Sequence, residues 1–165
     1  MSRAEPAQLV PINDVQPSLF AGRKLRVAGT VTALASSTLL ILSDLHPRTG
    51  HPPSSVLVDL SLCAVPSPPL KTPLMVLGTL TRRSTPIDLA FATAPAPIPP
   101  IDAQIAATVF PLRTDIRLPN RLFVLEALVC KPLDHTFDLA LWNHAARLRS
   151  HADWDTPLNI APHGS

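Results

Sequence analysis

The residues that could perform chemistry in this sequence are few, and they do not form a catalytic pattern. His46 and His51 flank a loop beside Asp44, and His144 and His151 stand seven positions apart in a helical segment. A metal site needs ligands held on rigid elements with a supporting set of hydrogen bonds, so these histidines favour a solvated or interface role. The sequence has no GxSxG, HExxH or CxxC motif and no glycine-rich phosphate loop. We therefore expect no enzymatic activity, no metal and no cofactor.

The two cysteines, Cys63 and Cys130, lie far apart and match neither a metal-binding spacing nor a disulfide framework. We expect both to be reduced, buried thiols of an intracellular protein. The N-terminus lacks a basic region followed by a hydrophobic run, and no apolar stretch approaches the roughly 18 residues that span a bilayer. Secretion and membrane insertion are therefore not expected.

Cationic side chains that could contact nucleic acid gather at three places in the chain. The formal net charge is only +2, far from the basic excess of a protein that holds nucleic acid by phosphate neutralisation alone. Stacking platforms for bases are also scarce, because the chain has no tyrosine and only seven other aromatic residues, five Phe and two Trp. We expect weak DNA binding by the isolated chain, and the alternative is that these are ordinary solvated charges. The candidate DNA-binding residues are Arg23, Lys24 and Arg26, then Arg82 and Arg83, then Arg113, Arg117 and Arg121.

The elements that must position these residues are short strands followed by one helix. Alternation of apolar and polar residues predicts strands over about 24–34, 38–45, 56–62, 74–81 and 122–130. Leu62 is expected to point inward at the end of the third strand. Gly29 and Gly78 stand in mid-strand, which suits a sharp bend or the close approach of another backbone.

These five strands fit a small closed barrel, and the OB-fold is the common five-stranded solution. A sandwich would need about seven strands, and an α/β fold would need helices where this sequence places many of its 20 prolines. We therefore expect an all-β chain with a C-terminal helix, a five-stranded OB-fold β-barrel that forms a single domain over 1–165. In such a barrel the second and third strands and two loops form the ligand face, close to the candidate arginines around 82 and 117.

Two segments lie outside this strand pattern. The apolar segment 9–20 is expected to pack across one end of the fold. Residues 83–120 form a proline-rich insertion between the last two strands. Within the insertion, 87–91 is expected to be a short edge strand and 104–110 another short element.

The final organised segment, 137–151, has helical periodicity, with Asp134 or Thr136 as the expected N-cap. A helix that packs on a barrel needs only one apolar stripe, but this helix has two. The apolar surface of the second stripe must therefore contact another protein or be covered by the insertion. We expect the stripe of Trp142 to face a partner and Leu141 and Leu148 to be buried. The two stripes are Phe137, Leu141, Ala145 and Leu148, and Leu139, Trp142 and Ala146.

The pieces PIND, GRKLRVAGTV, VLVDLSL, LMVLGTLTR and DLALWNHAARL, in this order, resemble the smallest OB-fold subunit of the CST telomere-capping complex, the TEN family. The similarity runs over about 9–83 and 122–149. It implies a nuclear protein at chromosome ends that forms a heterodimer with a larger OB-fold subunit, the pair protecting telomeric single-stranded DNA and supporting its replication. The insertion is longer than the family's usual connection, which puts DNA contacts of that loop in doubt.

The resemblance also implies where the partner binds, because in that family the barrel and the C-terminal helix grip it. The candidate partner-binding residues are Phe137, Leu141, Trp142, Ala145, Leu148 and Arg149. Two alternatives remain open at this point. The smallest subunit of replication protein A shares the barrel and helix but enters a trimeric helix bundle, and an OB-fold scaffold of a helicase and topoisomerase assembly is also an interaction module.

Overall fold

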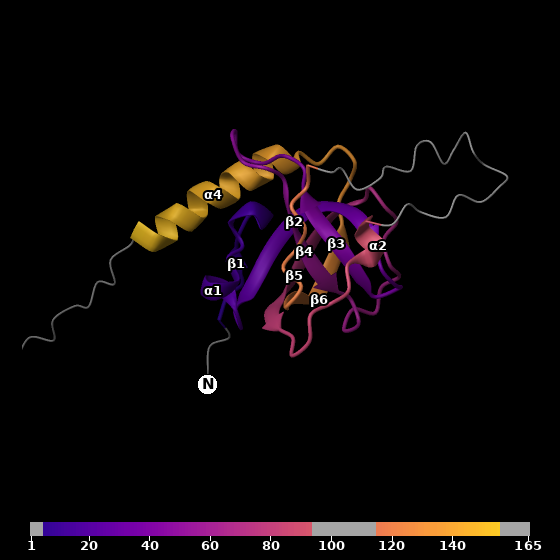
Figure 1. The fold of residues 1–165 in the computed structure, drawn as a ribbon. Coiled ribbons are helices and arrows are strands. Elements are labelled where there is room, and N and C mark those ends of the chain that lie inside the picture. The colour runs from indigo at the N-terminus through magenta and orange to yellow at the C-terminus, as the bar shows by residue number, and fades with distance from the viewer. Residues whose placement is uncertain (1–4, 94–114, 156–165) are drawn as a thin grey trace, which may run out of the picture.

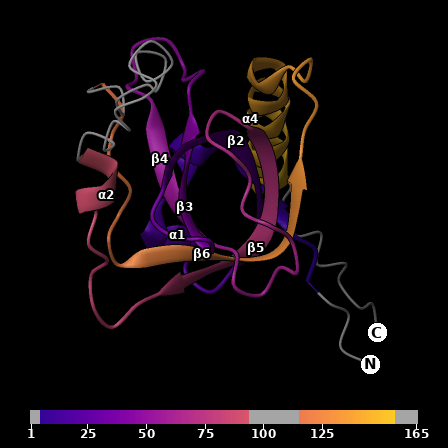
Figure 2. The ribbon, with the colours of Figure 1, turned by 90° about the vertical axis from the view of Figure 1, so that its right-hand side faces the viewer.

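The computed structural model describes residues 5–93 and 115–155, with side chains of the last helix described up to residue 150. A single sheet closes into a barrel because β2 pairs with β3 on one side and with β5 on the other (Figure 2). The strands are β1 (Gln8–Leu9), β2 (Lys24–Leu34), β3 (Leu39–Asp44), β4 (Ser54–Asp59), β5 (Pro73–Arg82) and β6 (Phe123–Pro132). The helices are η1 (Ile12–Asp14), α1 (Pro17–Phe20), α2 (Ala90–Thr93) and α4 (Leu139–Asp155).

The strand pairing is that of an OB-fold. β2, β3 and β4 form an antiparallel meander, β4 pairs with β6 in parallel, and β6 pairs with β5 in antiparallel register. Apart from the short β1, which adds to the edge of β2, these are the five strands of a closed Greek-key barrel. The predicted fold class is confirmed.

Alternate side chains of the strands fill the inside of this barrel, as the period of two requires. Leu25 and Val27 of β2 meet Leu74 and Val76 of β5 there, fully buried. The N-terminal segment closes one end, with Val10, Ile12 and Phe20 in the same core. The segment 9–20 therefore packs across the barrel end as expected.

The two mid-strand glycines stand where another part of the chain comes too close for a side chain. A Cβ on Gly29 would lie 2.6 Å from Cδ1 of Ile12 and 2.7 Å from the carbonyl oxygen of Ser43. A Cβ on Gly78 would collide with the backbone of Glu126 and Ala127 on β6. Close approach therefore explains both glycines.

Two strand predictions were wrong. β4 ends at Asp59, because the Asp59 carboxylate accepts a hydrogen bond from the Ser61 N–H (2.9 Å) and turns the chain, leaving Leu62 64% exposed. Residues 87–91 are not an edge strand. The Asp88 carboxylate accepts a hydrogen bond from the Ala90 N–H (3.0 Å), and the chain enters the short helix α2. The segment 104–110 lies outside the described residues.

Helix α4 starts later than the sequence predicted. Its N-cap is Asp138, whose Oδ1 accepts a hydrogen bond from the Leu141 N–H (2.9 Å). Asp134 instead accepts hydrogen bonds from the N–H and hydroxyl of Thr136, which lower the pKa of its carboxyl. The helix packs on β1 and β2 and runs outward past the barrel (Figure 1). No helix in the described ranges is long and apolar enough to cross a membrane.

A buried carboxylate lies near the contact between α4 and the barrel. Asp44, at the end of β3, is only 1% exposed. Burial raises the pKa of its carboxyl, while a hydrogen bond from the His46 N–H (2.9 Å) and the nearby charge of Arg147 on α4 act in the opposite direction. The net effect is a carboxyl that is harder to ionise in the folded protein than in the unfolded chain.

Replacing Gly78 with alanine tests the close approach of β5 and β6. Gly78→Ala should lower the free energy of unfolding by about 3 kcal/mol, because the clash is with backbone and cannot be relieved by a rotamer change. Gly50→Ala is the control: Gly50 has φ 82° and open space around it, so the strain should cost only about 1 kcal/mol. Equal losses in urea denaturation would contradict the packing explanation.

Asp44→Asn tests the buried carboxyl. Protonated Asp44 stabilises the fold fully below the unfolded-chain pKa of 3.8, and this contribution is lost as the pH rises through the higher folded-state pKa. The variant keeps an oxygen for the His46 N–H and carries no charge, so its free energy of unfolding should exceed that of the wild type near neutral pH and not in acid. Urea denaturation between about pH 3 and 7 measures this difference. A variant less stable than wild type at pH 7 would mean that attraction to Arg147 outweighs burial.

Candidate partner interface and nucleic-acid site

The side of α4 that faces away from the barrel carries an exposed apolar strip. Leu141 is 63% exposed and Leu148 is 61% exposed, on the same side of the helix as Ala145. Phe137, just before the helix, is also exposed. We call these four residues the outer face of α4. An apolar strip of this kind on a helix suits contact with another protein.

This orientation reverses the expectation for the two helix stripes. Leu141 and Leu148 are not buried, whereas Leu139 and Ala146 are, and Trp142 is half-buried at the edge of the contact with the barrel. The reason is that the inward side also carries polar residues. Asn143 is fully buried there, and the Ser150 hydroxyl lies 2.9 Å from the Leu9 carbonyl oxygen of β1, to which it donates a hydrogen bond.

The six candidate partner-binding residues therefore divide between two sides of the helix. The outer face holds four of them, Arg149 is exposed at its margin, and Trp142 is turned partly toward the barrel. The largest side chain of the set is thus not the centre of the exposed strip. Leu141 and Leu148 take that position.

The outside of the barrel at β3 and β4, the expected ligand face, is covered by the chain itself. The segment 87–93, including α2, lies against this face (Figures 1 and 2). Because the covering side chains are apolar and buried, a nucleic-acid strand cannot lie on the strands at this place. The cluster comprises Ala33, Ile41, Leu57, Leu89, Ala92 and Val124, with Leu39, Ile87 and Phe91 packed against it.

Two of the candidate DNA-binding arginines are engaged within the protein. The Arg83 guanidinium lies 2.9 Å from the Asp59 carboxylate and 3.4 Å from that of Glu126. Arg121 donates a hydrogen bond from Nε to the Ile87 carbonyl oxygen (2.7 Å), which helps to hold the covering segment. These contacts give Arg83 and Arg121 structural roles.

The remaining cationic candidates that the structure describes come from different elements of the fold. Arg23 and Arg82 lie toward the same end of the β2 and β5 ladder, where the Leu80 N–H donates to the Arg23 carbonyl oxygen (3.1 Å). Arg26 is exposed farther along β2, and Lys24 is half-buried. Arg117 lies at a pocket whose lining includes Leu80 and Phe123. Arg113 lies outside the described residues.

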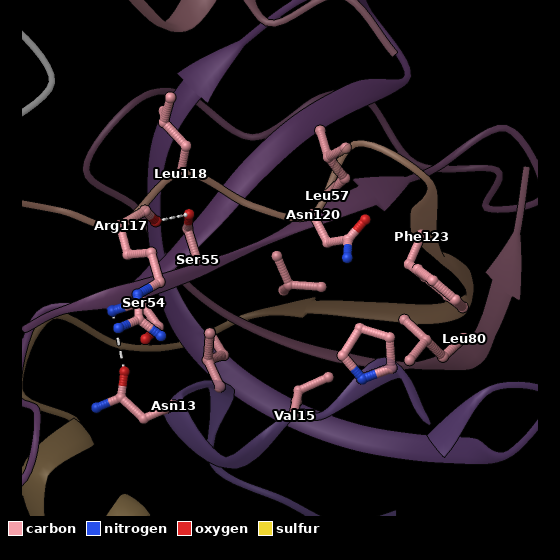
Figure 3. A pocket seen from close by; sticks show the side chains of 13 residues that line it. Asn13, Val15, Ser54, Ser55, Leu57, Leu80, Arg117, Leu118, Asn120 and Phe123 are labelled. Atoms are coloured by element: carbon pink, nitrogen blue, oxygen red, sulfur yellow. Dashed lines mark hydrogen bonds between the residues drawn. The ribbon is translucent and has the colours of Figure 1, made fainter. Parts of the chain in front are cut away.

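The pocket at Arg117 has a volume of about 350 Å³ and lies between η1, the start of β4 and the residues that precede β6 (Figure 3). Apart from Arg117, the sequence did not indicate its polar residues, because Asn13 lies in the single turn of η1 and Asn120 in the irregular segment before β6, where no periodicity marks them. The lining residues are Ile12, Asn13, Val15, Pro17, Ser54, Ser55, Val56, Leu57, Leu80, Arg117, Leu118, Asn120 and Phe123.

The cysteines and histidines do not form a metal site within the described ranges, where no group of three potential ligands comes together. Cys63 and Cys130 are free and half-buried beside the barrel core. The Cys63 thiol donates a hydrogen bond to the Ala127 carbonyl oxygen (3.2 Å). Burial, with a smaller contribution from Cys63, raises the pKa of Cys130 to about 11, so its reactive thiolate is scarce at neutral pH.

The fold and its surfaces define an OB-fold protein with a C-terminal helix. No protein-family model matches the sequence, and no curated protein matches it. Among solved structures, the chain is similar to one in the S. pombe Stn1–Ten1 complex, with 15% identity, coverage of 92% of this chain and 98% of that chain, and a TM-score of 0.49. The telomere capping protein Ten1 of the same organism matches at 15% identity, with 88% and 99% coverage and a TM-score of 0.47. A putative aspartyl-tRNA synthetase of Leishmania major matches at 8% identity, with 82% and 22% coverage and a TM-score of 0.40.

A pair of alanine variants tests the different environments of Arg82 and Arg83. Arg83→Ala should lower the free energy of unfolding by about 0.5 to 1 kcal/mol, because it leaves the neighbouring carboxylates of Asp59 and Glu126 unpaired. Arg82→Ala is the matched control and should change it by less than about 0.3 kcal/mol, since Arg82 is exposed. Urea denaturation measures both, and equal effects would show that the ion pairs of Arg83 contribute nothing.

Proposed function

We propose that this chain is a small, non-enzymatic OB-fold subunit of a telomere-capping complex of the CST type. In this proposal it forms a heterodimer with a larger OB-fold subunit, a counterpart of Stn1, in the nucleus. The pair together binds and protects telomeric single-stranded DNA and supports its replication.

The outer face of α4 is the observation that carries this proposal. Leu141 and Leu148 are large apolar side chains that remain more than half exposed although the opposite side of the same helix is anchored on the barrel. An anchored helix presents such a strip with little loss of backbone conformational entropy on binding, because its backbone is already ordered. The sequence resemblance to the TEN family supports the same assignment, since it implies that the barrel and the C-terminal helix together grip the partner.

The DNA role is assigned to the complex for two physical reasons. The strand face that OB-folds use for oligonucleotides is covered by the segment 87–93. The net charge of +2 also provides little counterion release. The isolated chain should therefore bind single strands weakly, and the larger subunit would supply most of the contacts.

Aspartate substitutions on the outer face test the proposed interface. Leu141→Asp and Leu148→Asp should each weaken the heterodimer by roughly 2 to 4 kcal/mol, about a 30- to 1000-fold loss of affinity, because each places a charge in a desolvated contact. The melting temperature of the isolated chain should change little, since both side chains are exposed. The partner is first identified by co-purification with the full chain from source cells, and its affinity is then measured by calorimetry.

Ala140→Asp is the matched control. Ala140 is exposed on α4 but lies away from the strip of Leu141 and Leu148. The affinity of the Ala140→Asp variant for the partner should therefore stay within about threefold of wild type. Equal losses in all three variants, or unchanged affinity in the two leucine variants, would contradict the assignment. Co-purification of a partner unrelated to OB-fold subunits would contradict the proposed complex itself.

A further inference from the structure

The pocket at Arg117 has two chemically different sides. Figure 3 shows Arg117 and Ser54 together on one side and Phe123 and Leu80 on the other. Asn120 lies between them, with its amide nitrogen toward the middle of the pocket. The pocket therefore combines a cation and hydroxyl groups, an amide and an aromatic ring within one small volume.

The Arg117 and Asn120 residues of the pocket are held in place by hydrogen bonds that leave the Arg117 guanidinium and the Asn120 amide nitrogen able to donate to a ligand. The backbone of Arg117 is fixed, because its N–H donates to the Pro53 carbonyl oxygen (2.8 Å) and its carbonyl oxygen accepts from the Ser55 hydroxyl (2.6 Å). Its guanidinium forms no ion pair with any residue that the structure describes. The Asn120 Oδ1 accepts a hydrogen bond from the Leu122 N–H (2.9 Å), which orients the amide and leaves its nitrogen free to donate.

The charge and shape of the pocket favour an anion with a flat ring. Its lining includes one arginine and no carboxylate. A guanidinium suits a phosphate, an aromatic ring offers a stacking surface for any base, and a side-chain amide can pair with a base edge. A volume of about 350 Å³ is at the small end of ligand pockets and holds one nucleotide, not a strand.

We propose that this pocket binds one nucleotide of single-stranded DNA. The base lies against Phe123 and near the Asn120 amide, and the phosphate lies at Arg117 and Ser54. This inference rests on the proposed function, in which the chain is part of a complex on single strands. It gives the chain a DNA contact that does not need the covered face of β3 and β4.

Titration of the isolated, ¹⁵N-labelled chain with the oligonucleotide dT4 tests the inference by NMR. The Asn120 side-chain amide and the backbone amides of Ser54 and Ser55 should shift. Arg117→Glu should weaken binding by about tenfold or more, and its backbone hydrogen bonds do not depend on the side chain. Arg48→Glu is the matched control with the same change of charge on an exposed loop, and it should stay within about twofold.

Three outcomes would overturn the inference. In the first, the pocket resonances do not shift at millimolar dT4. In the second, Arg48→Glu and Arg117→Glu lose equal affinity for dT4. In the third, the resonances of Ser54 and Asn120 shift on addition of the protein partner but not of dT4. The last outcome would identify the pocket as a peptide site. Partner affinity of Arg117→Glu is measured in parallel. If the heterodimer forms normally while dT4 leaves the pocket unchanged, only the pocket assignment is wrong.

Discussion

Closure of the barrel through β2 is the constraint on which the rest of the structure depends. β2 forms ladders with β3 and with β5 on its two edges, so the sheet closes on β2 and leaves no long free edge there. This requires backbones to approach closely at Gly29 and Gly78, where no side chain fits. Once the barrel is closed, the pleat decides which apolar residues point inward, and Ile41 and Leu57 remain outside. The segment 87–93 covers this outer pair, and the N-terminal segment closes the barrel end on which α4 partly rests.

The surfaces that remain after this packing differ in their chemistry. The outer face of α4 is apolar and is presented by a helix fixed through Leu139 and Ser150, which suits a protein partner. The pocket near Phe123 is amphipathic and small, which suits a single nucleotide. The usual oligonucleotide face of an OB-fold is closed by the chain's own insertion. In the proposed function, neither of these two described surfaces has to hold a long DNA strand, because the larger subunit supplies most of the contacts.

The strands and the fold class could be predicted because alternation is a local property, and the bounds of β2 coincide with the alternating segment. The orientation of α4 could not, because its inward side carries Asn143 and Ser150, so apolar periodicity pointed to the wrong stripe. Residues 87–91 misled in another way. Ile87, Leu89 and Phe91 alternate like a strand, but they lie over the outside of the barrel on a segment that turns into the short helix α2. The pocket depends on residues far apart in sequence that only the folded chain brings together.

The most direct test of the account is a methyl NMR measurement on the complex with the larger subunit. The methyl groups of Leu141 and Leu148 report on the outer face of α4, and those of Leu139 report on its buried side. Intermolecular nuclear Overhauser effects are expected from Leu141 and Leu148 to partner protons, and none from Leu139. Intermolecular nuclear Overhauser effects confined to Leu89 and the covering segment, with the methyl groups of the outer face still in contact with solvent, would contradict the outer face of α4 as the partner interface.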